Sequence, residues 1–360
     1  MSFTAIILAA GKGSRMKSSL SKPLHKVAGI EMISWVIDAA RSAGAELIIP
    51  VIRDDTPDLA SFLSGYSIAI QKNQNGTAAA VMAALPHIKN RDQPILVLYA
   101  DTLFINKDIM RELLDNIKSG SDICVLGFNA ENPSGYGRLV TSSTGSLDAI
   151  IEDSEASASQ KMITNVNAGI MAFNGSIIEE TIQKITPSNS KQEYFLTDIV
   201  SVGSKNNLSV DYILTDKEHV IGINNLEQLA IAESVAQNNL RRKAMLSGVT
   251  MIAPETVFLQ TDTIFGQDVI IEPNVVIAGG VSIASNCHIK SFCHLEKCSI
   301  GEGNIIGPFA RIRPDTVTRQ NVKIGNFVEV KKSTLGEGAK VNHLSYIGDT
   351  QIGDNANIGA

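Results

Sequence analysis

Two basic residues near the N-terminus, Arg15 and Lys22, follow a segment rich in small residues. The segment runs through Leu8, Ala9, Ala10, Gly11 and Gly13. Small side chains let a ligand approach the backbone, whose amide N–H groups can then face phosphate oxygens. The two cations add the positive charge that a triphosphate requires. The spacing therefore predicts a site for a nucleoside triphosphate and a sugar phosphate.

Other interpretations of this glycine-containing loop are weaker. A dinucleotide fingerprint needs a third glycine where Met16 stands, and the Gly-Lys-Ser/Thr of a Walker A loop is missing. An ordinary tight turn between a strand and a helix remains an alternative for a lone Gly-x-Gly. Arg15 and the Lys22-Pro23 pair favour the phosphate-binding interpretation.

Polar residues that follow the next predicted strands are candidates for a metal and a nucleobase. Asp101 directly follows an apolar run, a common position for a magnesium ligand in phosphoryl transfer, and the Asn224 amide oxygen could share that metal. Gln71 offers a donor and an acceptor to a base edge, and Gly76-Thr77 opens a helix beside it. The alternatives are a helix cap for Asp101 and an ordinary polar loop for 71–77.

The segment after residue 130 supplies candidates for binding a sugar. Gly137 lies in a turn that can bring backbone close to a ligand, and Glu152 and Asn167 could bond sugar hydroxyls and an acetamido group. Each of the two polar residues could equally be a solvated loop residue.

The elements that must position these residues alternate between strand and helix over the first 130 residues. Strands are predicted at 5–8, 47–51, 67–71, 95–99 and 123–128, and helices at 32–43, 77–85 and 107–117. A further helix begins within 192–198. This order predicts a doubly wound α/β sheet of parallel strands with ligands at their carboxyl ends.

A second pattern fills the C-terminal third of the chain. Residues 225–246 predict a connecting helix of about 33 Å. From about residue 264, aliphatic residues recur every six positions, beginning at Ile271, Ile277 and Ile283. A sustained hexapeptide repeat predicts a left-handed parallel β-helix. We therefore expect domains at 1–226 and 249–360, with 227–248 as the linker.

Within these repeats, several polar residues interrupt the apolar pattern. Arg313 and Lys331 could hold a sugar phosphate, and His343 could remove a proton from an amine. Tyr346 and Asn357 add a phenol and an amide. Packing or solvent exposure is the alternative for a single histidine.

Composition narrows the function classes. The chain has 360 residues, 44% of them apolar, and a net charge of −6 without a basic run, which argues against a nucleic-acid partner. The four cysteines match no zinc or disulfide spacing, so we expect buried free thiols. No apolar run approaches the length of a membrane span, so we expect a cytoplasmic protein with no membrane partner.

Taken together, the motifs resemble those of bifunctional N-acetylglucosamine-1-phosphate uridylyltransferases and glucosamine-1-phosphate acetyltransferases, over the whole chain. The resemblance implies a Rossmann-like nucleotidyltransferase domain followed by a trimeric left-handed β-helix. It implies Mg²⁺ on Asp101 and Asn224, with UTP and N-acetylglucosamine-1-phosphate as substrates. Such enzymes supply precursors of the cell envelope, including peptidoglycan and lipopolysaccharide.

The resemblance also implies roles for individual residues. Arg15, Lys22 and His343 would be catalytic, with His343 as the general base of acetyl transfer from acetyl-CoA to glucosamine-1-phosphate. The uridylyl site would comprise Leu8, Ala9, Ala10, Gly11, Lys22, Gln71, Gly76, Thr77, Tyr99, Ala100, Asp101, Gly137, Glu152, Asn167 and Asn224. The acetyl-acceptor site would comprise Arg313, Lys331, Tyr346 and Asn357, with Ala360 near acetyl-CoA.

The sequence also departs from that family's pattern. Ala78-Ala79 replaces Gly-His, Ala100 replaces the glycine of Tyr-Gly-Asp, and Ser154 stands where a lysine is common. The chain ends before several further coils, so we expect impaired acetyl transfer. The alternatives are a nucleotidyltransferase for another nucleotide and sugar phosphate, and a β-helix that serves only assembly.

Overall fold

A computed structural model describes residues 2–73, 75–143, 145–187 and 192–359. These residues form two compact units. The first contains the residues up to His25 together with Glu31–Leu229, and the second contains Lys26–Ile30 and the residues from Ala230 onward.

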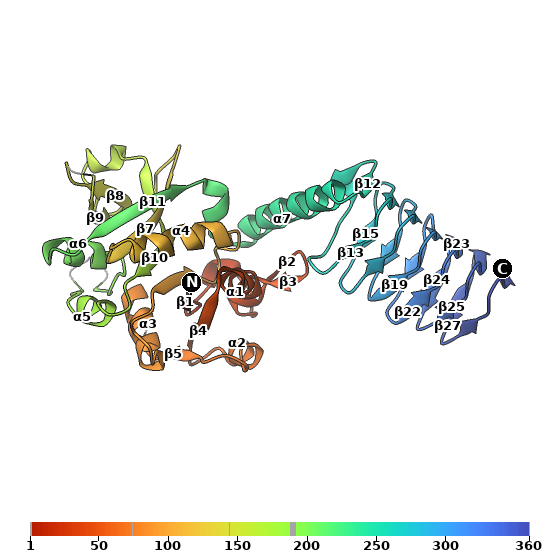
Figure 1. The fold of residues 1–360 in the computed structure, drawn as a ribbon, viewed down its shortest axis with the longest axis horizontal. Coiled ribbons are helices and arrows are strands. Elements are labelled where there is room, and N and C mark those ends of the chain that lie inside the picture. Colours follow the sequence, from red (N-terminus) through yellow and green to blue (C-terminus); the bar gives the residue numbers. More distant parts are fainter. Residues whose placement is uncertain (1, 74, 144, 188–191, 360) are drawn as a thin grey trace. The chain divides into compact units, whose positions relative to one another are not determined.

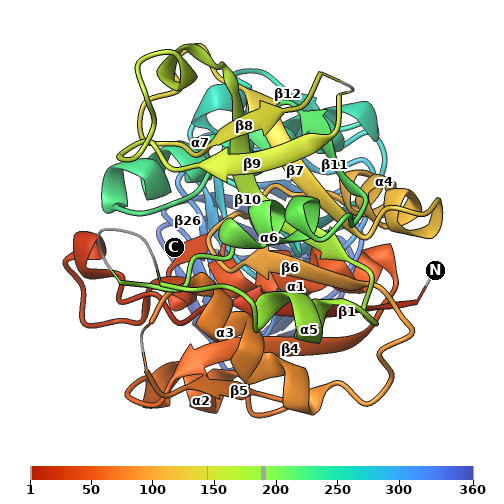
Figure 2. The same ribbon diagram turned by 90° about the vertical axis from the view of Figure 1, so that its left-hand side faces the viewer.

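The first unit is built on one mixed sheet (Figures 1 and 2). Its main strand order is β11-β7-β10-β6-β1-β4-β5. The strands on this path are β1 (Phe3–Leu8), β4 (Ala45–Arg53), β5 (Ala69–Gln71), β6 (Ile95–Tyr99), β7 (Ile123–Asn129), β10 (Asn165–Phe173) and β11 (Val210–Thr215). The five strands predicted from the first 130 residues are therefore present.

One strand makes the expectation of a purely parallel sheet wrong. Strand β10 lies between β6 and β7 and is antiparallel to both. Two further strands, β8 (Arg138–Thr141) and β9 (Leu147–Ile151), form an antiparallel pair, and β8 also meets β10. They belong to the region where the alternation of strand and helix ends.

Helices cover both faces of this sheet. They are α1 (Met32–Ala43), α2 (Pro57–Phe62), α3 (Thr77–Ala84), α4 (Lys107–Lys118), α5 (Ile178–Ile182) and α6 (Asp198–Lys205). Ile7 of β1 belongs to one core cluster with Ile33 of α1, whereas Ile6 belongs to another with Val81 of α3. Because successive strand residues face opposite sides, this alternation places a core on each face.

Helix α7 (Leu226–Leu246) begins in the first unit and continues into the second, which includes the chain from Ala230 onward. Ala232, Ala236 and Ala244 of this helix are buried, whereas Leu226 is exposed. Gln237 exchanges two hydrogen bonds with the backbone of Leu259, at 2.6 and 2.9 Å. Buried polar groups need such partners, so a polar residue fixes this helix to the first coil. Strands β2 (Lys26–Val27) and β3 (Ile30–Glu31) form a short ribbon.

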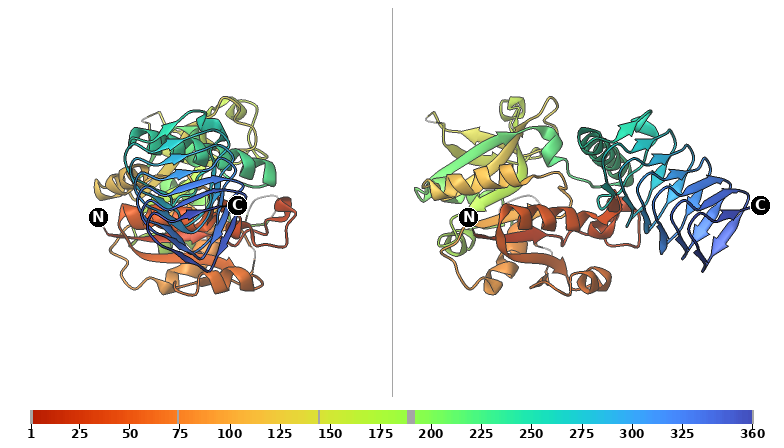
Figure 3. Two further views of the ribbon diagram at one scale, coloured as in Figure 1. Left: turned by 90° about the vertical axis from the view of Figure 1, so that its right-hand side faces the viewer. Right: turned by 45° about the vertical axis from the view of Figure 1, so that its right-hand side comes forward.

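The rest of the second unit is a parallel β-helix with three sheets, which confirms the hexapeptide prediction (Figure 3). Its first sheet contains β12 (Thr250–Met251), β14 (Ile270–Ile271), β17 (His288–Ile289), β20 (Ile305–Ile306), β23 (Lys323–Asn326), β26 (Lys340–His343) and β29 (Asn357–Ile358). The second contains β13 (Ile264–Phe265), β16 (Ser282–Ile283), β19 (Cys298–Ile300), β22 (Thr316–Thr318), β25 (Thr334–Leu335) and β28 (Gln351–Ile352). The third contains β15 (Val276–Ile277), β18 (His294–Leu295), β21 (Arg311–Ile312), β24 (Glu329–Lys331) and β27 (Tyr346–Gly348).

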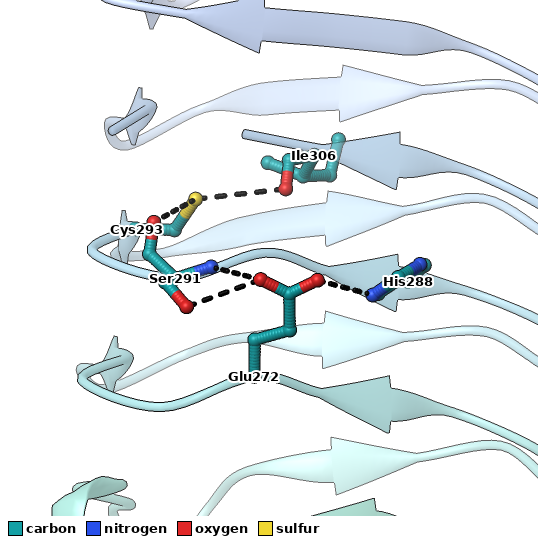
Figure 4. Close-up of polar contacts among 5 residues, drawn as sticks. All are labelled: Glu272, His288, Ser291, Cys293 and Ile306. Carbon is teal, nitrogen blue, oxygen red and sulfur yellow. Dashed lines mark hydrogen bonds and ion pairs between the residues drawn. The ribbon is translucent and has the colours of Figure 1, made fainter. Parts of the chain in front are cut away.

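Polar groups outside the β-helix and thiols inside it link successive coils (Figure 4). Glu272 accepts hydrogen bonds from His288 Nε2 at 2.8 Å and from the Ser291 amide at 3.0 Å. Cys293 Sγ lies inside the coil, 3.6 Å from the carbonyl oxygen of Ile306. All four cysteines are free and buried, as expected. Burial raises the pKa of the Cys293 thiol to about 11, so this residue packs as a small hydrophobe.

Within the described residues, we find no helix that is long and apolar enough to cross a membrane.

Candidate functional site

A cavity of about 450 Å³ lies in the first unit at the carboxyl ends of β1, β5 and β6. Most residues predicted for the nucleotide site line it, namely Leu8, Ala9, Ala10, Gly11, Arg15, Lys22, Gln71, Gly76, Thr77, Tyr99, Ala100, Asp101 and Asn224. Parallel strands bring their carboxyl ends to one edge, which explains why segments distant in sequence meet here.

The small-residue loop continues the parallel pairing beyond β1 before it turns. The amide of Ala9 donates to the Val51 carbonyl at 2.9 Å, and the amide of Ala100 donates to Leu8 at 3.0 Å. Gly13 has φ +61°, and a Cβ there would lie 2.7 Å from Cβ of Lys22. A glycine is therefore needed for the Lys22 side chain to pass this turn.

Two cations and two oxygen ligands converge at the cavity wall. Lys22 forms an ion pair with Asp101, and its Nζ donates to Oδ1 of Asn224 at 3.1 Å. Arg15 donates to the same Asn224 oxygen at 2.9 Å. The side chains of Lys22 and Asp101 are only 12% and 24% exposed, so solvent screens their attraction less than at an open surface.

This arrangement fits a magnesium ion. The Asp101 carboxylate and the Asn224 amide oxygen already face a common cation, the Lys22 ammonium. The described residues contain no cluster of three or more His, Cys, Asp or Glu side chains suited to a metal. Magnesium is, however, typically held by one or two protein oxygens together with substrate phosphates.

The loop that carries Gln71 and Gly76 is held in place by hydrogen bonds and by a close backbone contact. Gln71 donates its side-chain amide to the Gly76 carbonyl at 3.0 Å, so the predicted base-reading side chain also supports its own loop. Gly76 has φ +102°, and a Cβ there would lie 2.4 Å from the carbonyl oxygen of Tyr194. Thr77 Oγ1 accepts from the Leu196 amide at 2.9 Å. Burial, followed by the nearby Asp101 charge, raises the pKa of Tyr99, so its phenol stays neutral.

The three predicted sugar-binding residues gather together, although they are not part of the lining of this cavity. The Asn167 amide donates to the Gly137 carbonyl at 2.8 Å, and a Cβ on Gly137 would lie 3.8 Å from Oε1 of Glu152. The Asn167 side-chain oxygen accepts from the Gly169 amide at 2.9 Å. The nitrogen of the same side-chain amide is a hydrogen-bond donor.

Some cavity residues were not predicted from the sequence. They are Ala80, Glu193 and Phe195. Lys12, Gly13, Ser14 and Pro23 also line the cavity, and they belong to the basic, glycine-containing motif from which the site was predicted. Glu193 and Phe195 carry no comparable signal, because hydrogen bonds of Tyr194 and Leu196 with the region around Gly76 bring their segment to the cavity.

The predicted acetyl-acceptor residues lie on neighbouring coils of the β-helix. The Arg313 amide donates to the Val330 carbonyl at 2.8 Å, which places Lys331 on the adjoining coil, and the Arg313 guanidinium donates to Glu329 at 2.7 Å. Tyr346 lies on the same sheet and is 60% exposed.

The other two residues predicted for that site belong to the first sheet. His343 ends β26 and is exposed, and Asn357 begins β29, where its side-chain oxygen accepts from Asn342 at 2.9 Å. Ala360 lies outside the described residues.

An α/β sheet with a basic glycine-containing loop, followed by hexapeptide coils, defines a nucleotidyltransferase joined to a hexapeptide-repeat domain. Family models support both parts: a MobA-like NTP transferase domain matches residues 5–166, and bacterial transferase hexapeptide repeats match residues 262–297.

Whole-chain comparisons identify the particular family. The chain is 43% identical to the bifunctional protein GlmU of Bartonella quintana over 99% of its own length and 80% of the relative's. It is 45% identical to that of a Chelativorans species, over 99% and 79%, and 41% identical to that of Azorhizobium caulinodans, over 100% and 81%. The chain therefore belongs to the bifunctional GlmU family and is a homologue of its pyrophosphorylases and acetyltransferases.

Proposed function

We propose that the first unit transfers a uridylyl group from UTP to N-acetylglucosamine-1-phosphate, releasing pyrophosphate and UDP-N-acetylglucosamine. The observation that carries the proposal is the convergence of Lys22, Arg15, Asp101 and Asn224 at one cavity wall. A site for two phosphorylated substrates needs cations and metal ligands at the same place.

In this reaction a sugar-phosphate oxygen attacks the α-phosphorus of UTP, and the bond to pyrophosphate breaks in line. The nucleophile is already anionic, so the residues need not move a proton. Lys22 and Arg15 stabilise charge on the transferring and leaving groups. Asp101 and Asn224 would hold Mg²⁺, which neutralises phosphate charge when bound. The backbone around Ala9–Gly11 faces the nucleotide phosphates.

For the acceptor sugar, we assign binding roles to Gly137, Glu152 and Asn167. A carboxylate accepts hydrogen bonds from sugar hydroxyls, and the Asn167 nitrogen can donate to an acetamido oxygen. Gln71, Gly76 and Thr77 would bind the base. The uridylyltransferase domain would then comprise residues 1–226, followed by the 227–248 linker and the 249–360 β-helix domain.

For the β-helix, we propose acetyl transfer from acetyl-CoA to glucosamine-1-phosphate. Arg313 and Lys331 would bind the phosphate, with Tyr346 and Asn357 beside the sugar and His343 as the proton acceptor. We also propose a homotrimer, which sedimentation can test. The appearance of free thiol from acetyl-CoA, dependent on glucosamine-1-phosphate and lost in His343→Ala, would support this activity, and its absence would contradict it.

A substrate panel tests the uridylyl-transfer proposal. Pyrophosphate release is measured with UTP, CTP, dTTP and ATP, each combined with N-acetylglucosamine-1-phosphate and glucose-1-phosphate. We expect the highest kcat/KM for UTP with N-acetylglucosamine-1-phosphate. A clear preference for another nucleotide or for the unsubstituted sugar would contradict the proposal.

A further inference from the structure

Residues 193–198 form a segment that was not part of the predicted site. This segment contacts both the loop predicted to bind the base and a residue predicted to bind the sugar. At the nucleotide end, the Tyr194 amide donates to the Asn75 carbonyl at 2.6 Å, and the Ala78 amide donates to the Tyr194 carbonyl at 2.9 Å. The Leu196 amide adds its bond to Thr77. Three backbone groups therefore fix the position of this segment before it reaches α6.

At the sugar end, the next residue of the segment contacts Glu152. Thr197 is 9% exposed, and its hydroxyl donates to Oε1 of Glu152 at 3.0 Å. The threonine side chain is branched at Cβ and therefore has few χ1 states. Its hydroxyl is thus held in place by both the backbone and the rotamer.

The backbone that carries Glu152 is fixed independently. Glu152 follows β9 directly, and the next residue, Asp153, pairs with Arg138 at 2.8 Å. The Arg138 side chain is 2% exposed and also donates to the Tyr136 carbonyl. One buried guanidinium thus holds the turn around Gly137 together with the loop of Glu152. The remaining freedom of Glu152 lies in its side-chain torsions.

A hydrogen bond to one oxygen of a carboxylate restricts the rotation of the group. The second oxygen then points in a defined direction. The terminal torsion of glutamate is otherwise broad, so an unrestrained carboxylate would sample many orientations. Sugar hydroxyls are oriented donors, and a preorganised acceptor binds them with a smaller entropy loss.

We infer that Thr197 is a positioning residue, which acts through Glu152 to orient its carboxylate toward the hydroxyl groups of the acceptor sugar. Thr197 therefore sets affinity for the sugar phosphate and has little effect on the nucleotide. The inference rests on the uridylyl transfer proposed above.

The test compares Thr197→Val, which keeps the branched shape and removes the hydroxyl, with Thr197→Ser, which keeps the hydroxyl. kcat and both KM values are measured, together with calorimetric binding of N-acetylglucosamine-1-phosphate. We expect valine to raise the KM of the sugar phosphate about tenfold, as for loss of one hydrogen bond to a charged group. The KM of UTP should stay within about twofold in both variants, and serine should restore most of the sugar affinity.

Two further variants make the result specific. Thr181→Val is the matched control, because Thr181 is 5% exposed and donates at 2.8 Å to the carbonyl of Ile177, the residue just before its own helix α5. This control should leave the KM of the sugar unchanged. In a Glu152→Ala background, Thr197→Val should have no further effect on the KM of the sugar. Thr197→Ala replaces the valine variant if valine prevents folding.

Several results would overturn the inference. They are an unchanged KM for the sugar in Thr197→Val, an equal rise in both KM values, and a serine variant as impaired as valine. If the wild-type chain forms UDP-N-acetylglucosamine but gives one of these results, the positioning role alone fails. If the wild-type chain neither binds nor uses N-acetylglucosamine-1-phosphate, both proposals fail.

Discussion

The ammonium of Lys22 donates to Oδ1 of Asn224 at 3.1 Å, although 202 positions separate the two residues in the chain. Asp101 pairs with the same ammonium. The contact joins the basic loop after β1 to the segment before α7 and defines the charged centre of the cavity.

Replacing Lys22 tests this centre directly. Lys22→Ala should lower kcat by about 10²–10³-fold, because a positioned cation stabilises charge that develops in the transition state. The KM of the sugar phosphate should change much less. Steady-state rates for both substrates provide the measurement. Equal effects on kcat and on the KM of the sugar would show that Lys22 serves ground-state binding instead.

Asp101→Asn should change the magnesium requirement. The amide keeps the shape of the side chain but removes the negative charge that a divalent ion needs. The Mg²⁺ concentration for half-maximal rate should rise by about tenfold or more, since even outer-shell partners contribute that much to metal affinity. Asp108→Asn, at an exposed position on α4, is the control. An unaltered magnesium titration in Asp101→Asn would exclude Asp101 as a ligand.

Gly76→Ala should destabilise the first unit by about 2–4 kcal/mol, through its positive φ and the close Tyr194 backbone. Gly120→Ala separates the two causes, because Gly120 has φ +114° but open space around its Cα. We expect about 1 kcal/mol for that control, the ordinary cost of the left-handed conformation. Urea unfolding measures both, and equal losses would show that the Tyr194 contact contributes nothing.

The Arg138–Asp153 pair should make stability depend on pH. The Gly135 amide and then the Arg138 guanidinium lower the pKa of Asp153 below its ordinary value of 3.8. A depressed folded-state pKa adds stability above the unfolded-state value, and this stability is lost as pH falls through the folded-state value. Asp153→Asn should therefore destabilise the protein at neutral pH and lose most of that effect in strong acid. A deficit that is the same at both pH values would contradict the pairing.

The cysteines should react slowly in the native state. Cys124, Cys287, Cys293 and Cys298 are all buried, and burial raises the pKa of each thiol. Because the thiolate is the reactive form, a colorimetric thiol reagent should titrate the thiols only after denaturation. Rapid reaction of any of them in the folded protein would show that the core around that thiol opens.

The sequence predicted the parts of the fold that depend on local patterns. Helix α1 was predicted at its observed bounds, and the six-residue repeat placed Ile271 and Ile277 inside the coils. Strand β10 was missed because its position between β6 and β7 depends on pairing partners distant in sequence. Glu193 and Phe195 were missed for the same reason, since hydrogen bonds of the neighbouring Tyr194 and Leu196 to a segment distant in sequence bring them to the cavity.

We propose that the charged centre around Lys22 and Asn224 performs uridylyl transfer. The most direct measurement is magnesium-dependent formation of UDP-N-acetylglucosamine from UTP and N-acetylglucosamine-1-phosphate, followed by ³¹P nuclear magnetic resonance in the wild-type chain. We predict stoichiometric UDP-N-acetylglucosamine and pyrophosphate, with the rate abolished by a chelator and restored by Mg²⁺. Absence of both products with magnesium present would contradict uridylyl transfer at this site.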